Sequence, residues 1–175
     1  MTGEERLQSV AEDESKVFVS DCRHQYLEVT AKLKCPSNVD TAVIVVGNSG
    51  AKKYLDACTK ALQSHKVIMV ASQGINLAKL VSVVEQVKQQ SGRISQMNKM
   101  YVQLSLINPK FLASDSIKNV QIFFGDEIVG DKTESALREI KGHKVFEVPC
   151  MSIILSLEEV PKADFGDWTI QVKGQ

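Results

Sequence analysis

Lysine side chains follow two glycine-containing turns in the first half of the chain. Lys52 and Lys53 come directly after the turn Gly47-Asn48-Ser49-Gly50, and Lys79 comes five residues after Gly74. Each turn leads into a segment with helical periodicity, so all three lysines fall near the start of a helix, where the helix dipole disfavours a cation by roughly a few tenths of a kcal/mol. Positive charge beside free backbone N–H groups is typical of a place where an anion binds. The two turns are therefore candidate anion sites.

A pattern typical of a buried strand precedes each turn. Residues 41–46 read TAVIVV and residues 66–71 read KVIMVA, which are runs expected of strands covered on both faces. Helices are predicted over 51–64 and over 76–90, the second with Asn76 as its N-cap. The return between the first helix and the second strand is short, which predicts parallel neighbouring strands whose turns emerge at the same edge of the sheet. We therefore expect the lysines to converge.

The remaining segments complete a predicted α/β fold. It is a two-layer domain over 41–160 in the order β-α-β-α-β-β, with two helices on one face of a mixed sheet. Further strands are predicted over 100–106, with Val102, Leu104 and Leu106 inward and Tyr101, Gln103 and Ser105 toward solvent, and over 150–157 after an interruption at Pro149. Residues 107–143 are interpreted as an insertion with a strand at 119–124 and a short helix at 133–140.

Extensions are predicted at both ends of this domain. Residues 1–15 are polar and acidic and are expected to be a disordered tail. Residues 16–40 are expected to add strands at 16–20 and 26–33, because the second of these alternates apolar and polar side chains. The C-terminal extension over 161–175 includes a predicted edge strand at 168–172 that pairs with the N-terminal strands.

Charge is unevenly distributed in a chain whose net charge is zero. Lys and Arg number one against five Asp and Glu in residues 1–15, thirteen against five in 16–110, and seven against eleven in 111–175, so the balance is −4, +8 and −4. A basic middle segment is typical of a face that meets a polyanion, although chance clustering on a solvated surface explains it equally well. No apolar run approaches the roughly 20 residues that span a bilayer, so we expect an intracellular, soluble protein without a membrane partner.

Tests for catalytic and metal motifs are negative. The segment GNSGAKK lacks the spacing of a phosphate-binding loop, and no G-x-G-x-x-G is present. The four cysteines are scattered without C-x-x-C spacing, which favours reduced thiols. Cys22 and His24 are too small a constellation for a nucleophile or metal site, and the acidic cluster Asp126, Glu127, Asp131 and Glu134 is interpreted as a surface loop. No catalytic residue, cofactor or metal is expected.

Several segments together resemble the Alba superfamily of small nucleic-acid-binding proteins. VIVVGNSGAKKYLDACTKAL is similar to its first strand and helix, SHKVIMVASQG to its second strand and glycine turn, and INLAKLVSVVEQVKQQ to its second helix. The resemblance covers about residues 41–106 and 145–157. Within the superfamily, QMNKMYVQLSLI and FEVPCMSIILSLEEV most resemble the Alba-type subunits of nuclear ribonuclease P and ribonuclease MRP, especially the fungal one.

This resemblance implies a non-catalytic role on RNA. Such subunits pair as heterodimers with a second Alba-type protein, and the pair binds a structured domain of the catalytic RNA within a larger ribonucleoprotein that processes tRNA and rRNA. It implies a nuclear, nucleolar location, and in yeasts the same pair is found on telomerase RNA. The sequence departs from the archaeal DNA-binding members, which carry paired lysines after the first glycine and an arginine after the second. Asn48-Ser49 and Ile75 stand there, so coating of duplex DNA is not expected.

The candidate RNA-binding residues combine these lysines with nearby donors, and each has a simpler alternative. Lysines near a helix start are often only solvated, the amides serve equally well as turn and cap residues, and Tyr101, a candidate for base stacking, is alternatively buried beneath the insertion. A protein-interaction module that has lost nucleic-acid binding is the competing function, and an enzyme is the third. The full set is Lys52, Lys53, Gln73, Asn76, Lys79, Arg93 and Lys99.

Overall fold

The computed structural model describes residues 3–35, 37–107, 145–161 and 165–171. The chain divides into two compact units, one of residues 1–18 with 102–149 and one of residues 19–101 with 150–175. The predicted strand at 119–124 and helix at 133–140 lie outside the described residues, as does nearly all of the predicted insertion and its acidic cluster. Among the described residues, no helix combines the length and the apolar character that crossing a membrane requires.

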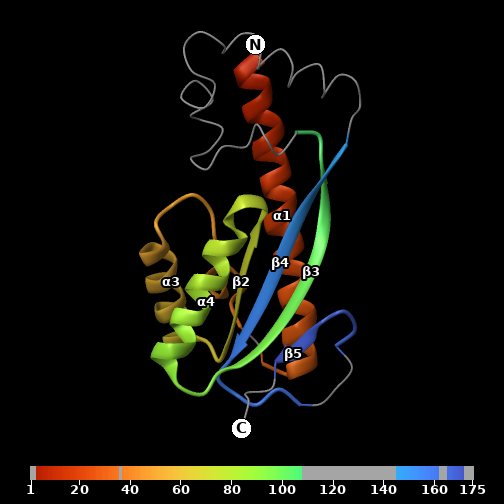
Figure 1. Ribbon diagram of the computed structural model, residues 1–175. Helices are drawn as coiled ribbons and strands as arrows, with labels where there is room; N and C mark the ends of the chain where they lie inside the picture. The colour runs from red at the N-terminus through yellow and green to blue at the C-terminus, as the bar shows by residue number, and fades with distance from the viewer. Residues whose placement is uncertain (1–2, 36, 108–144, 162–164, 172–175) are drawn as a thin grey trace. The chain divides into compact units, whose positions relative to one another are not determined.

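A five-stranded mixed sheet forms the framework, in the order β1-β2-β4-β3-β5 (Figure 1). The mixed α/β class is confirmed, and so is the parallel pairing of β1 with β2, in which Ile44 lies opposite Val70. β4 pairs antiparallel with β2, and β5 pairs antiparallel with β3 at the edge. The strands are β1 (Val43–Val45), β2 (Val67–Gln73), β3 (Ser95–Ser105), β4 (Phe146–Ser156) and β5 (Thr169–Gln171).

Two helices, α3 (Ala51–Ser64) and α4 (Leu77–Ser91), cover one face of the sheet as predicted (Figure 1). They are amphipathic, and burial of their apolar faces against β2 and β4 stabilises the unit. Val83 faces this core, whereas Val81 is 45% exposed. The core between helices and sheet includes Cys58, Leu80, Val84, Val87, Ile68, Val70, Ile153 and Leu155.

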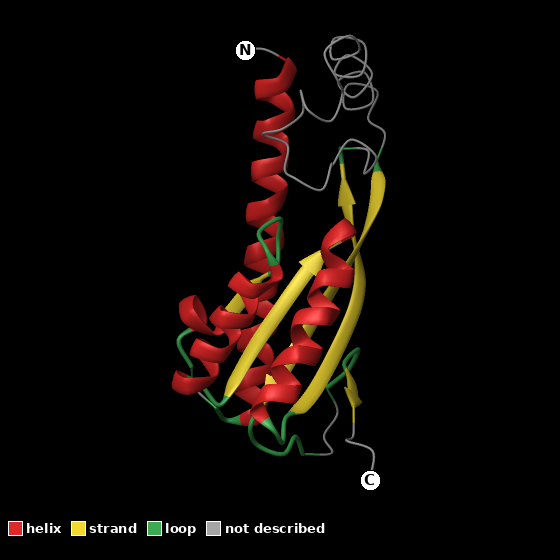
Figure 2. Cartoon of the chain, turned by 60° about the vertical axis from the view of Figure 1, so that its left-hand side comes forward, coloured by secondary structure: helices red, strands yellow, loops and turns green. Residues whose placement is uncertain are grey.

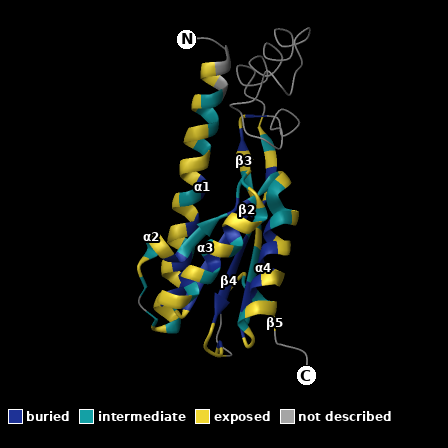
Figure 3. Ribbon diagram, turned by 90° about the vertical axis from the view of Figure 1, so that its left-hand side faces the viewer, coloured by how far each residue is buried: buried dark blue, intermediate teal, exposed yellow. Residues whose placement is uncertain are grey.

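The opposite face of the sheet is covered by a third layer, the helix α1 (Gly3–Leu33), in its part from residue 19 onward (Figure 2). Cys22, Tyr26 and Val29 on this helix are buried, and the Tyr26 hydroxyl donates a 2.8 Å hydrogen bond to the Val67 carbonyl oxygen of β2. The Ser152 hydroxyl of β4 likewise donates to Gln25 Oε1 at 2.7 Å. Figure 3 shows the end of β4, residues 152–156, dark blue because helices cover it on both sides.

The predictions for the N-terminal segment are therefore wrong. Residues 3–15 are helical rather than disordered, and no strand forms at 16–20 or 26–33. The alternation over 26–33 does not match the observed burial. A strand with this alternation would turn Leu27 inward, but Leu27 is 48% exposed. The buried positions Phe18, Cys22, Tyr26 and Val29 are spaced by four, four and three residues, which is the period of a helix.

β3 differs from its prediction in length and in orientation. The strand begins at Ser95 rather than at residue 100. From residue 100 onward its apolar side chains point outward, since Met100 is 69%, Val102 53% and Leu104 64% exposed, whereas Ser105 is buried. In the first unit, the Glu14 carboxylate of α1 accepts hydrogen bonds from the Ser105 hydroxyl at 2.7 Å and the Leu106 amide at 2.8 Å, which explains why polar side chains face inward there.

The other strand boundaries are corrected in smaller ways. β1 is shorter than predicted because residues 39–42 form a helical turn, α2 (Val39–Ala42), capped by Asn38, whose side chain accepts from the Asp40 amide. β4 continues through Pro149, which is exposed and does not end the strand. β5 pairs with β3, not with the N-terminal segment, because that segment is helical.

Candidate nucleic-acid interface

The two glycine turns meet at one edge of the sheet, as the sequence predicts. β1 and β2 are parallel, so the turn at 47–50 and the short 3₁₀ turn η1 (Gly74–Asn76) leave the sheet side by side. The Asn76 amide donates to Asn48 Oδ1 at 3.2 Å, and the Ser72 hydroxyl donates to the Val46 carbonyl oxygen at 2.7 Å. Gly74 adopts φ of 60°, a conformation that glycine allows without steric cost. Side-chain hydrogen bonds thus join the two turns.

Lys79 extends from α4 to the first turn rather than into solvent. Its ammonium donates to the carbonyl oxygens of Gly47 at 2.8 Å and Ser49 at 2.9 Å. The same nitrogen lies 6.0 Å from the centre of the Tyr54 ring, within range of a cation–π attraction. The sequence predicts Lys79 as a phosphate contact, and the structure places its charge on the backbone of the neighbouring turn.

Lys52 and Lys53 are exposed in the first turn of α3. The Lys53 ammonium lies 3.4 Å from the Ser49 hydroxyl oxygen, so Lys53 and Lys79 approach the same residue from two helices. Lys52 is the adjacent residue on the same turn. The predicted convergence of lysines is confirmed, while their role in binding RNA stays a prediction.

Both helices start without a capping side chain. Gly50 and Asn76 occupy the N-cap positions of α3 and α4, neither makes a side-chain capping bond, and no acidic residue lies in either first turn. The predicted cap at Asn76 is thus wrong in its bonding, because its amide is directed to Asn48 instead. First-turn N–H groups have no partner within their own helix, so two positive helix ends and three lysines share this edge.

Tyr54 is a part of the site that the sequence reasoning missed. This buried side chain of α3 accepts a 3.1 Å hydrogen bond from the Ser49 amide at its hydroxyl. Burial alone raises the pKa of Tyr54, but hydrogen bonds from Ser49 and Gly47 and the charge of Lys53 outweigh it, and the pKa lies below its usual value. Tyr54 lies one helical turn before Cys58, on the same buried face of α3, and this spacing was the signal that could have identified it.

Of the other candidates, Gln73 lies near the two turns, whereas Arg93 and Lys99 lie elsewhere in the fold. Gln73 ends β2 at the turn edge, where its side-chain oxygen lies 3.8 Å from the Cys150 thiol. Arg93 is exposed and follows the C-terminal end of α4, which is about 22 Å long at 1.5 Å per residue. Lys99 lies within β3, its ammonium 6.0 Å from the centre of the Trp168 ring. Arg93 and Lys99 are therefore not brought to the turns.

Tyr101 does not offer its ring for stacking in the predicted way. Its side chain is only partly exposed and its hydroxyl is buried, close to Cys22 and Gln25 of α1. Burial first, and then the nearby Cys22, raises the pKa of Tyr101. The alternative, burial beneath the insertion, lies outside the described residues.

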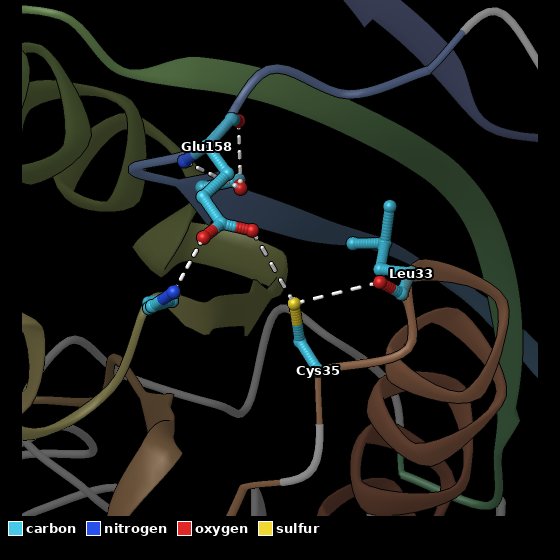
Figure 4. A network of polar contacts seen from close by, with 5 residues as sticks. Leu33, Cys35 and Glu158 are labelled. Atoms are coloured by element: carbon cyan, nitrogen blue, oxygen red, sulfur yellow. Dashed lines mark hydrogen bonds and ion pairs between the residues drawn. The ribbon is translucent and has the colours of Figure 1, made fainter.

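A second polar network lies at the opposite edge, where β2 begins (Figure 4). Glu158 accepts hydrogen bonds from the Lys66 ammonium at 2.6 Å and from the Cys35 thiol at 3.7 Å, and the same thiol lies 3.5 Å from the Leu33 carbonyl oxygen. Burial and the Glu158 charge raise the pKa of Cys35, so the thiol stays protonated and is a poor nucleophile. This network ties the end of α1 to the sheet.

The described residues hold no group of three or more potential metal ligands.

The Alba family model matches residues 42–103, about a third of the chain, and this segment is therefore similar to an Alba domain. It contains β1, α3, β2, α4 and most of β3, with both turns. Alba domains are generally non-catalytic modules that bind nucleic acids or proteins and commonly form dimers. No curated protein matches the chain.

Proposed function

We propose that this chain is a non-catalytic RNA-binding subunit of a nuclear ribonucleoprotein of the ribonuclease P or ribonuclease MRP type. In this proposal it binds a structured RNA domain as a heterodimer with a second Alba-type protein. The RNA carries out catalysis, and the complex processes tRNA and rRNA. Support comes from the match of residues 42–103 to the Alba family and from the resemblance of residues 96–107 and 146–160 to subunits of these enzymes.

The observation that carries the RNA assignment is the edge where the two turns meet. Two uncapped helix starts and the exposed Lys52 and Lys53 present positive charge there, without an acidic residue in either first turn. Such an arrangement is slightly unfavourable for the isolated protein and is favourable once an anion arrives. Phosphate contacts of this kind supply sequence-independent affinity through release of counterions.

The partner is supported by β3. Val102 and Leu104 form a short exposed apolar row on one face of this strand. A contiguous apolar patch on a protein surface is typical of an interaction site, since leaving it in water has a free-energy cost. In our proposal the second Alba-type protein covers this row and contributes further cations to the turn edge, where the described residues place the exposed Lys52 and Lys53.

The test uses the complex purified from its native cells, with wild-type chain or with the double substitution Lys52→Glu and Lys53→Glu. Titration with the co-purified RNA at several salt concentrations should show weaker binding, and the slope of log affinity against log salt should fall by about 0.7–0.9 per lost phosphate contact. Lys60→Glu is the matched control, because Lys60 is an exposed lysine two helical turns further along α3. Equal affinity and slope for the double variant and wild type contradict the assignment.

A specific observation favours the competing function, a protein-interaction module that no longer binds nucleic acid. Lys79 is bonded to backbone carbonyls, and Asn48-Ser49 and Ile75 stand where DNA-binding members of the superfamily carry cations. A native complex that keeps its protein partner but binds no structured RNA selects this alternative.

A further inference from the structure

Lys79 is the half-buried lysine of the turn edge, and its hydrogen bonds are internal. Two of the three N–H groups of its ammonium are directed at carbonyl oxygens, of Gly47 at 2.8 Å and of Ser49 at 2.9 Å. The Tyr54 ring lies against the same nitrogen at 6.0 Å. A phosphate that bound Lys79 directly would have to compete with these short contacts, whereas Lys52 and Lys53 are exposed.

Side chains from β2, α3 and α4 hold the turn at 47–50 through hydrogen bonds to its backbone and to that of Val46. Ser72 donates to the carbonyl oxygen of Val46, and the Tyr54 hydroxyl accepts from the amide of Ser49. Lys79 adds two more hydrogen bonds, to the carbonyl oxygens of Gly47 and Ser49. Gly50, the last residue of this turn, provides no capping side chain for α3. The path of the turn therefore decides where α3 starts and where Lys52 and Lys53 lie.

We infer that Lys79 is a positioning residue of the proposed RNA site, which fixes the turn at 47–50 so that Lys52 and Lys53 face the RNA, and that it makes no phosphate contact itself. This inference rests on the proposed function. It divides the three lysines by role: two bind, and one holds the backbone that carries them.

The experiment compares Lys79→Met and Lys79→Arg with wild type in the native complex. Two quantities are measured: RNA affinity as a function of salt, and hydrogen exchange of the Ser49 amide, which reports whether its bond to Tyr54 persists. Lys79→Met should weaken RNA binding severalfold when Lys52 and Lys53 are present, should add no further loss to the Lys52→Glu, Lys53→Glu variant, and should speed exchange at Ser49. Lys79→Arg, which keeps cationic N–H donors, should restore both. If Lys79→Met does not fold, Lys79→Gln keeps one donor and replaces it.

Two outcomes overturn the inference. A further loss of RNA affinity when Lys79→Met is added to the Lys52→Glu, Lys53→Glu variant means that Lys79 contacts the RNA itself, and so has a binding rather than a positioning role. Faster exchange at Ser49 with unchanged RNA affinity means that the shape of the turn does not matter for RNA. Failure of the proposed function is distinguishable, because then the double substitution of Lys52 and Lys53 also leaves RNA affinity unchanged.

Discussion

The hydroxyl of Tyr101 is buried and makes no hydrogen bond to any described residue. The Ser152 hydroxyl nearby donates to Gln25 Oε1 instead. A buried polar group without a partner loses its hydration without compensation, so its removal costs nothing in hydrogen bonding. Tyr101→Phe should therefore leave the free energy of unfolding unchanged or raise it by up to about 1 kcal/mol in urea denaturation.

Tyr26→Phe is the matched control for that substitution. The Tyr26 hydroxyl donates to the Val67 carbonyl oxygen at 2.8 Å, so this variant should lose about 1–2 kcal/mol. An equal loss in the two variants contradicts the assignment of Tyr101 as unsatisfied.

Cys58 makes stability dependent on alkaline pH. Burial raises the pKa of this thiol from 9.0 to about 12, so above pH 9 the unfolded chain releases the proton while the folded chain keeps it. The stabilisation is complete below pH 9 and is lost as the pH rises toward 12, by at most about 1.4 kcal/mol per pH unit. Urea unfolding between pH 8 and 10.5 should show a shallower decline for Cys58→Ala than for wild type. Identical declines would rule out the ionisation of Cys58 as a cause.

At the scale of elements, α1 is the departure from the sequence prediction that can be tested most simply. Glu28 is exposed in the interior of this helix. Glu28→Pro should destabilise the protein by roughly 3 kcal/mol and reduce helical circular dichroism, because proline removes a hydrogen bond and clashes with the preceding turn. Glu28→Ala should be neutral. If proline at position 28 is tolerated as well as alanine, the segment is not the helix described.

The sequence correctly predicted those elements whose hydrophobic pattern fits only one kind of secondary structure. Continuous apolar runs before glycine turns identified β1 and β2, and the amphipathic period identified α3 with its observed bounds. The segment at 26–33 fits both periods, because Val29 and Leu33 belong to the alternating set and to the helical set. Because α1 was not predicted, the inward and outward faces of β3 were assigned the wrong way round. Polar residues such as Ser105 face inward only when a helix with matching polar groups covers them.

The outward face of β3 gives a second test at this scale. Leu104→Glu changes a side chain that is 64% exposed, so it should alter the free energy of unfolding by no more than about 0.5 kcal/mol, whereas Met97→Glu, at a fully buried position, should prevent folding. In our proposal Leu104→Glu also weakens assembly with the second protein, measured by size-exclusion chromatography of the complex. A Leu104→Glu variant that unfolds as readily as Met97→Glu contradicts the orientation of β3.

For the whole molecule, the sequence located the candidate site but not its internal bonding. The repeat of strand, glycine turn and lysine predicted one shared edge, because parallel neighbouring strands end together. It could not predict that Lys79 would bind Gly47 and Ser49, since that depends on the path of the turn. Arg93 and Lys99 were grouped with the site by charge alone. Arg93 follows the far end of α4, and Lys99 lies on β3, two strands from β2 in the sheet.

The most direct measurement is an amide NMR map of this chain, isotope-labelled within its native complex, during titration with the co-purified RNA. The account predicts that the largest chemical-shift changes fall on residues 48–53 and 74–79, the two turns and the starts of α3 and α4. Changes centred on Arg93 and Lys99, with the turns unaffected, would contradict it.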